Sequence, residues 1–119
     1  MLTVRHPDRT VAFYAALGAR EVRFGEGRRA VEIGGQRINL HTAGMEIEPH
    51  ARAPVPGSGD VCLLLEGTIG EALAALAEAG IPVELGPVPR TGAAGPLLSV
   101  YVRDPDGNLV ELAEVGGPD

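Results

Sequence analysis

Two side chains, Glu111 and His41, are candidates for chemistry because each occupies the polar side of an alternating apolar run. Glu111 lies between Val110 and Leu112, where a charge is unfavourable unless it is paired, bound to a metal or exposed to water. His41 ends a run that contains Leu40 and precedes a loop. Each residue could be a metal ligand, and each could instead be a solvent-exposed residue at a strand end.

A tight turn in front of Glu111 sets its direction. Pro105 fixes φ at one corner and Asp106-Gly107-Asn108 supply residues that tolerate positive φ, so a hairpin joins two apolar runs. Strict alternation along both strands then separates an apolar face from a polar one. The polar face carries Ser99, Tyr101, Arg103, Leu109 and Glu111. A polar face on strands that are rich in β-branched residues indicates a concave, functional surface.

Tyr101 and Arg103 are candidates for substrate binding because they share the face of Glu111. Either could hydrogen-bond a substrate oxygen or carboxylate. Arg103 could equally form an ion pair with Asp104 or Asp106. The pattern leaves both alternatives open.

Three further residues have a binding interpretation beside a simpler one. Arg90 lies among Gly, Pro and Thr residues, where it could clamp an anion or remain a solvated loop residue. Asn39 shares the predicted face of His41 and is a further candidate for substrate binding. Cys62 would share the face of Asp60, but a single cysteine in an apolar strand is usually a small hydrophobic residue.

Composition restricts the class of protein. A chain of 119 residues and 12.3 kDa has room for one domain with its own core. Its net charge of −6 argues against nucleic-acid binding. All ten basic residues are arginine, which excludes chemistry that needs a lysine. One cysteine cannot form an intramolecular disulfide, and no apolar run could cross a membrane, so a cytoplasmic, soluble protein is expected.

The first half of the chain predicts one helix and four strands. A short strand at 1–5 precedes a helix that Asp8 can cap and Gly18 ends. Strands at 20–24, 28–33 and 37–41 follow, the last two joined by a Gly34-Gly35 hairpin turn. Residues 42–59 hold three prolines and four glycines or serines without periodicity, which predicts a linker or covering loop.

The second half repeats this order. After a strand at 60–65, Thr68 and Glu71 have the spacing of a capping box, and Gly80 ends the helix. A short strand at 83–85, a glycine- and proline-rich loop at 86–96 and the final hairpin complete it. Aligning Gly18 with Gly80 and the two glycine turns with each other, we place His41 opposite Glu111. The repeat predicts two βαβββ modules around one cleft.

Several stretches resemble the vicinal oxygen chelate superfamily, which includes lactoylglutathione lyases, ring-cleaving dioxygenases and proteins of bleomycin and fosfomycin resistance. The stretches are Ile38 to His41, Pro54 to Ser58, Gly86 to Ala93, Ser99 to Tyr101 and Arg103 to Leu109. They are most similar to the branch of glyoxalase-domain-containing protein 5 and bacterial virulence proteins. The resemblance covers nearly the whole chain.

The resemblance implies an α+β fold in which two βαβββ modules form a half-open, glyoxalase-like barrel around a divalent metal. It implies one domain over 1–119, with modules at about 1–41 and 60–115 and a linker at 42–59. Carried over by position, His41, Asp60 and Glu111 are the implied metal ligands. One imidazole and two carboxylates suit Mn, Fe, Co, Ni or Zn without selecting one of them.

One ligand of the family pattern has no counterpart in the sequence. Relatives carry a histidine about two residues before the position of Met1. Either the chain is shortened there or the site has one ligand fewer. His6 cannot easily replace that histidine, because it follows the predicted strand and precedes Pro7.

The resemblance therefore implies a metal-dependent enzyme of the lactoylglutathione-lyase type. It would act on a small molecule with two vicinal oxygens and stabilise an enediolate-like anion, with Glu111 moving the proton and with glutathione or another thiol as a potential co-substrate. The alternatives are a non-catalytic binding protein of the bleomycin-resistance type and a metal-dependent thiol transferase acting on antibiotics. A homodimer is expected, and neither nucleic acid nor membrane is an expected partner.

Overall fold

The computed structural model describes residues 1–116 and has an α+β fold of two βαβββ modules. The sequence prediction of this fold is confirmed. The first module holds β1 (Leu2–Val4), α1 (Pro7–Ala16), β2 (Arg20–Phe24), β3 (Arg28–Ile33) and β4 (Gln36–Thr42). The second holds β5 (Asp60–Leu64), α2 (Ile69–Ala79), β6 (Leu85–Gly92), β7 (Gly95–Arg103) and β8 (Leu109–Val115).

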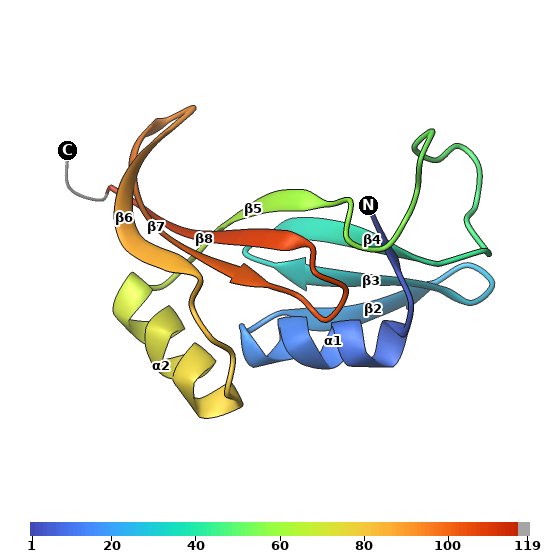
Figure 1. The fold of residues 1–119 in the computed structure, drawn as a ribbon, viewed down its shortest axis with the longest axis horizontal. Coiled ribbons are helices and arrows are strands. Elements are labelled where there is room, and N and C mark those ends of the chain that lie inside the picture. Colours follow the sequence, from blue (N-terminus) through green and yellow to red (C-terminus); the bar gives the residue numbers. More distant parts are fainter. Residues whose placement is uncertain (117–119) are drawn as a thin grey trace.

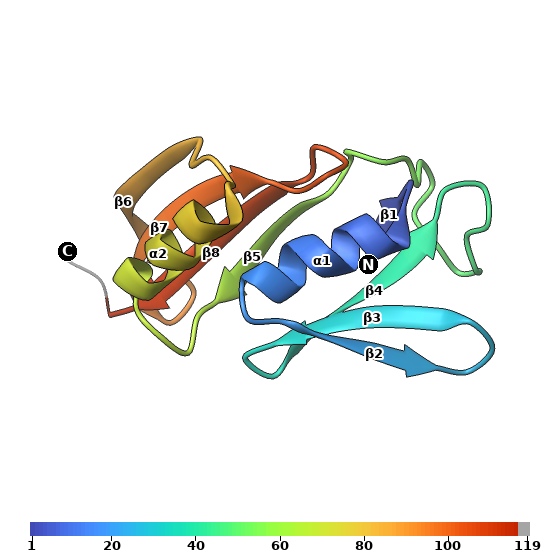
Figure 2. The same ribbon diagram turned by 90° about the horizontal axis from the view of Figure 1, so that it is seen from below.

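Each module forms one four-stranded sheet. Sheet A has the order β1-β4-β3-β2 and sheet B the order β5-β8-β7-β6; in both, the first strand pairs with the last in parallel and the other pairs are antiparallel. Both helices lie on the same side of the sheets, which stand next to each other (Figures 1 and 2). We call the sheet surfaces without helices the open faces of sheets A and B.

The core lies between the helices and the sheets. Val100, Val102, Val110 and Leu112 are fully buried, as the alternation along the final hairpin predicts. Burying each such side chain contributes roughly 1.5–3 kcal/mol of stability. Their polar neighbours are thereby directed to the open face of sheet B.

The two helices begin differently. Thr68 caps α2 through a complete capping box with Glu71, as predicted, and Gly80 ends it in a left-handed conformation. The prediction that Asp8 caps α1 is wrong, because the cap is His6 and Pro7 opens the helix. Proline suits this first position, since a backbone N–H there would have no partner within the helix. Within residues 1–116, neither helix is long and apolar enough to cross a membrane.

The prediction of a loop at 86–96 is wrong over most of its length. Leu85–Gly92 forms β6, which pairs with β7 and shifts register between Leu85 and Val88. β6 is the edge strand of sheet B, and prolines are tolerated there because their missing N–H groups face away from the ladder. Gly86 allows the irregularity, because a Cβ there would lie 2.5 Å from the carbonyl oxygen of Ser99.

The turn between β7 and β8 also joins the two modules. Asp104 is buried; its Oδ1 accepts the backbone N–H groups of Asp106 and Asn108, and its Oδ2 accepts the Asn108 amide. The phenol of Tyr14, in α1, donates to the same Oδ2 over 3.2 Å. Burial, reinforced by the charge of Asp104, raises the pKa of Tyr14 well above its ordinary value, so the phenol remains a donor. The turn therefore anchors α1 to sheet B.

Candidate functional site

The open face of sheet B brings two predicted ligands together. Glu111 in β8 pairs with Cys62 in β5, and Asp60 lies two residues before Cys62 on the same face. Asp60 and Cys62 are exposed. Burial and then the charges of Glu111 and Asp60 raise the pKa of the Cys62 thiol, which keeps it protonated at neutral pH. Cys62 thus shares the face of Asp60, as the alternation predicts, and it is exposed instead of packing as a small hydrophobic residue.

Ser99 orients Glu111. Its hydroxyl is fully buried in β7 and donates to Oε2 of Glu111 over 2.8 Å. A hydrogen bond to a carboxylate is charge-assisted and fixes the side chain in one direction. The alternation along the strand placed Ser99 on this face but did not assign it a role. The available signal for a role was its position close to Glu111 across the predicted hairpin.

The predicted substrate-binding residues of this face differ in whether their side chains are already held by ion pairs. Arg90 donates to the Tyr101 hydroxyl over 3.0 Å, and its guanidinium lies 5.5 Å from the centre of the Tyr101 ring. Arg103 is held by Glu84 in a double hydrogen bond of 2.9 and 3.0 Å, so its ion-pair partner is neither Asp104 nor Asp106. Arg90 and Tyr101 thus act as one unit, and Arg103 is committed to Glu84.

The open face of sheet A holds His41, which is only 4% exposed. The backbone N–H of Ile47, in the segment after β4, donates to its Nδ1 over 3.4 Å, and its Nε2 is buried without a partner. Burial, and then the charge of Arg28, lowers the pKa of His41, so the imidazole is neutral at neutral pH. Because Nδ1 accepts a hydrogen bond, the single ring proton lies on Nε2.

Asn39 is the second polar residue of this face with an unpartnered buried atom. Its Oδ1 has no hydrogen-bond partner. Asn39 pairs with Ala30 in β3, and Ala30 is completely buried. A buried carbonyl oxygen without a donor is costly, unless a cation or a ligand completes it.

The strand registers correct the alignment of the two modules. Gly34 and Gly35 form the predicted turn with φ of 56° and 75°, and Gly107 closes the matching turn with φ of 87°. Four residues after Gly35 stands Asn39, and four residues after Gly107 stands Glu111. Asn39, and not His41, is therefore the counterpart of Glu111, so pairing His41 with Glu111 was wrong.

One chain does not gather the three predicted ligands. Asp60 and Glu111 lie together, but His41 is surrounded by Arg28, Glu46, His50 and the N-terminus. No group of three histidine, cysteine, aspartate or glutamate side chains in residues 1–116 is placed to hold a metal. The open faces lie next to each other instead of opposing each other (Figure 1).

The donors present still fit a divalent cation. Asp60 and Glu111 form no ion pair with any arginine or histidine of the part of the chain that the structure describes. Asn39 Oδ1 is an unpartnered oxygen at the position that corresponds to Glu111. Oxygen donors of this kind suit hard divalent metals such as Mg or Mn. His41 lies on the open face of sheet A, apart from both carboxylates.

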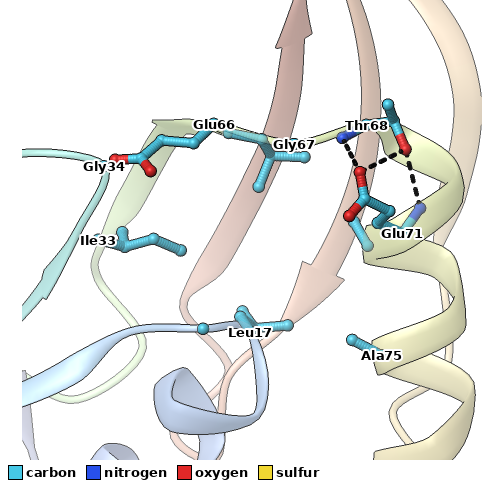
Figure 3. Close-up of a pocket in the computed structure, with 11 residues that line it drawn as sticks. Leu17, Ile33, Gly34, Glu66, Gly67, Thr68, Glu71 and Ala75 are labelled. Atoms are coloured by element: carbon cyan, nitrogen blue, oxygen red, sulfur yellow. Dashed lines mark hydrogen bonds between the residues drawn. The ribbon is translucent and has the colours of Figure 1, made fainter.

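A cavity of about 250 Å³ lies elsewhere, beside the start of α2 (Figure 3). Its apolar lining includes Leu17, Ile33 and Ala75, and Glu66 and Glu71 stand at its edge. None of the predicted site residues lines it. The chemistry of Glu111 and its neighbours therefore belongs to the open faces and not to this cavity.

Comparisons with known proteins agree with the fold. The family model of the Glyoxalase/Bleomycin resistance protein/Dioxygenase superfamily matches residues 1–112. The Glyoxalase domain-containing protein RDO1 of Mycosarcoma maydis is 52% identical over 113 residues, which are 95% of this chain and 64% of that protein. The chain thus spans less than two thirds of that relative.

Solved structures show the same architecture. Virulence protein STM3117 of Salmonella typhimurium is 44% identical, with a TM-score of 0.89 over 95% of this chain and 90% of that one. A lactoylglutathione lyase of Agrobacterium tumefaciens is 27% identical, with a TM-score of 0.68 over 96% and 89% of the two chains. The fold of this chain is therefore similar both to that of a virulence protein and to that of a lactoylglutathione lyase.

Proposed function

Because the chain belongs to the Glyoxalase/Bleomycin resistance protein/Dioxygenase superfamily, we propose that it is a metal-dependent enzyme of the glyoxalase type, acting on a small molecule with two adjacent oxygens. One observation carries the proposal. Asp60 and Glu111 stand on neighbouring strands of an open face, and no ion pair within residues 1–116 balances their charges. Two such carboxylates favour a cation between them.

The proposed site is shared by two chains. Asp60 and Glu111 of one chain and Asn39 of its partner would hold the metal. The exposed apolar residues Leu64, Leu85 and Val115 support the pairing, because all three lie on the open face of sheet B and a second chain would cover them. A cytoplasmic homodimer is the proposed form of the protein.

The residues of the site have distinct roles. A divalent metal, when bound, would polarise two adjacent oxygens of the substrate and make a neighbouring C–H more acidic. Glu111 would accept that proton and return it to the adjacent carbon, so no oxidant or reductant is needed. Ser99 would keep the carboxylate of Glu111 in position. Arg90 and Tyr101 would contact the substrate from the same face.

The test is a thermal-shift series with Mg, Mn, Co, Ni and Zn salts, because a ligand that binds only the folded state raises its stability. We expect one or more metals to raise the melting temperature of the parent protein and to leave Glu111→Ala unchanged. Glu78→Ala, an exposed carboxylate of α2, should respond like the parent. Proton exchange of hemithioacetals and simple hydroxycarbonyls in deuterated water, with and without glutathione, then tests catalysis and thiol dependence.

A non-catalytic binding protein is the second candidate, favoured by the proton on His41 Nε2. That nitrogen can donate a hydrogen bond to an organic molecule in the conformation observed. This candidate predicts no thermal shift with any of the metals. A dimer without metal binding would support it against the enzyme.

A further inference from the structure

The open face of sheet A carries an arginine whose charge no carboxylate balances. Arg28 forms no ion pair with any carboxylate of residues 1–116; its guanidinium carbon instead lies over the ring of Phe24, 4.9 Å from the ring centre. Stacking of this kind orients a guanidinium without neutralising it. Six other arginines have carboxylate partners: Arg5, Arg20, Arg23, Arg29, Arg37 and Arg103.

Arg28 lies in one row with His41. Phe24 pairs with Arg28 across β2 and β3, and Thr3 pairs with His41 across β1 and β4. Arg29 pairs with Leu40, so the same register continued by one residue sets Arg28 opposite His41. Their charges interact, since Arg28 contributes to the lowered pKa of His41.

One polar group near Arg28 is short of a partner. The Nε2 of His41 is buried and has no hydrogen-bond partner within residues 1–116. Ala30, next to Asn39, adds little bulk to this face. A buried donor that is left unsatisfied destabilises the folded protein. An oxyanion at this place would accept from the imidazole N–H and balance the guanidinium.

We propose that the open face of sheet A binds an anionic group of the substrate, a carboxylate or a phosphate, with Arg28 as its counter-ion and His41 as the neighbouring hydrogen-bond donor. The inference rests on the proposed function in one respect: the anion is part of the molecule that reaches the metal. The substrate is thereby an acid or a phosphate ester and not a neutral carbonyl compound. Ile47, in the segment after β4, contacts the imidazole of His41, which is buried.

The test measures anion binding and metal binding separately. Chelator-treated, isotopically labelled protein is titrated with inorganic phosphate in one series and with acetate in another, and the amide signals of residues 28 and 41 are followed by NMR. We expect one or both anions to bind and Arg28→Ala to bind about 10- to 100-fold more weakly, the loss expected for a charge-assisted hydrogen bond. The series that shows the larger loss identifies the anion as phosphate or carboxylate.

Matched variants decide the outcome. Arg28→Lys should recover part of the affinity, and Arg9→Ala, an exposed arginine of α1 without an ion pair in the described residues, should bind like the parent. Equal affinity of the parent and Arg28→Ala, or an equal loss in Arg9→Ala, overturns the inference. If anions bind through Arg28 and no metal binds, the proposed function fails alone; if the metal binds and no anion does, the inference fails alone.

Discussion

The open faces of the two sheets belong to modules with the same order of elements, but their properties are opposite. On sheet B the carboxylates of Asp60 and Glu111 stand beside an exposed thiol and exposed apolar side chains. On sheet A the polar groups are buried, a segment covers His41, and the unbalanced charge belongs to Arg28. The two modules therefore differ in the groups without an ion pair in residues 1–116: sheet B presents Asp60 and Glu111, with Arg90 nearby on the same face, and sheet A presents Arg28.

The difference explains why one chain looks incomplete. A negatively charged face fits a metal, and a positively charged face fits an anion. A substrate that both contacts the metal and carries an anionic group therefore requires both faces. In the proposed dimer, the face with the carboxylates of one chain would meet the face with Arg28 of its partner.

The largest effect is expected at Asn39. If its amide oxygen completes the metal site, Asn39→Ala should weaken binding of Mn or Mg about 10- to 100-fold, comparable to the loss of a supporting residue at other metal sites. His41→Ala should leave metal affinity nearly unchanged, because Asn39 and not His41 stands at the position that corresponds to Glu111. Isothermal titration of both variants checks this. The reverse order of effects would restore His41 as the ligand.

A smaller effect is expected at Ser99. Ser99→Ala removes the hydroxyl that donates to Glu111, so metal affinity should fall about tenfold while the fold is kept. Ser58→Ala removes a serine hydroxyl from the loop before β5 and serves as the control. Metal affinity and circular dichroism of both variants are measured together. An unchanged affinity in Ser99→Ala would show that Glu111 needs no support.

Cys62 reports on whether sheet B is covered. Its thiol is exposed in one chain, so in a dimer that pairs the two open faces its alkylation by iodoacetamide should slow several-fold relative to dilute monomer. The matched control is Cys62→Ala combined with Glu78→Cys, which moves the thiol to the exposed side of α2. Equal rates at low and high protein concentration would contradict the covering of this face.

The smallest effect concerns pH. The folded-state pKa of His41 lies below its ordinary value, so the unfolded chain binds a proton first as the pH falls. Stability should therefore decrease as the pH falls below the ordinary histidine value of about 6.5. Urea unfolding of chelator-treated protein at pH 7.5 and 5.5 should show a smaller decrease for His41→Gln. Equal decreases would mean that His41 is not buried as described.

Much of the fold could be predicted because its signals are local. Alternation placed Val100 and Val110 in the core, the spacing of Thr68 and Glu71 marked the start of a helix, and Gly34-Gly35 marked a hairpin. β6 was missed because glycines and prolines usually end strands, and only its position at the sheet edge makes them acceptable there.

The site was harder to predict because its determinants are long-range. The link between Tyr14 and Asp104 joins residues that are 90 positions apart, and no spacing rule shows it. The burial of His41 depends on how the segment after β4 folds back, which its irregular composition does not specify. The assignment of Asn39 as the counterpart of Glu111 was available from the sequence, because each stands four residues after the glycine that closes its turn.

The central claim is that each site combines sheet B of one chain with sheet A of another, and mixing two inactive variants tests it most directly. Glu111→Ala lacks a carboxylate, and Asn39→Lys introduces a positive charge that repels the metal. Each variant alone should bind no metal. After unfolding and refolding together, half of the dimers are mixed and each mixed dimer has one intact site, so metal binding should return to about a quarter of the parent level. No recovery, with mixed dimers demonstrated by mass spectrometry, would show that each site is built within one chain and would contradict the claim.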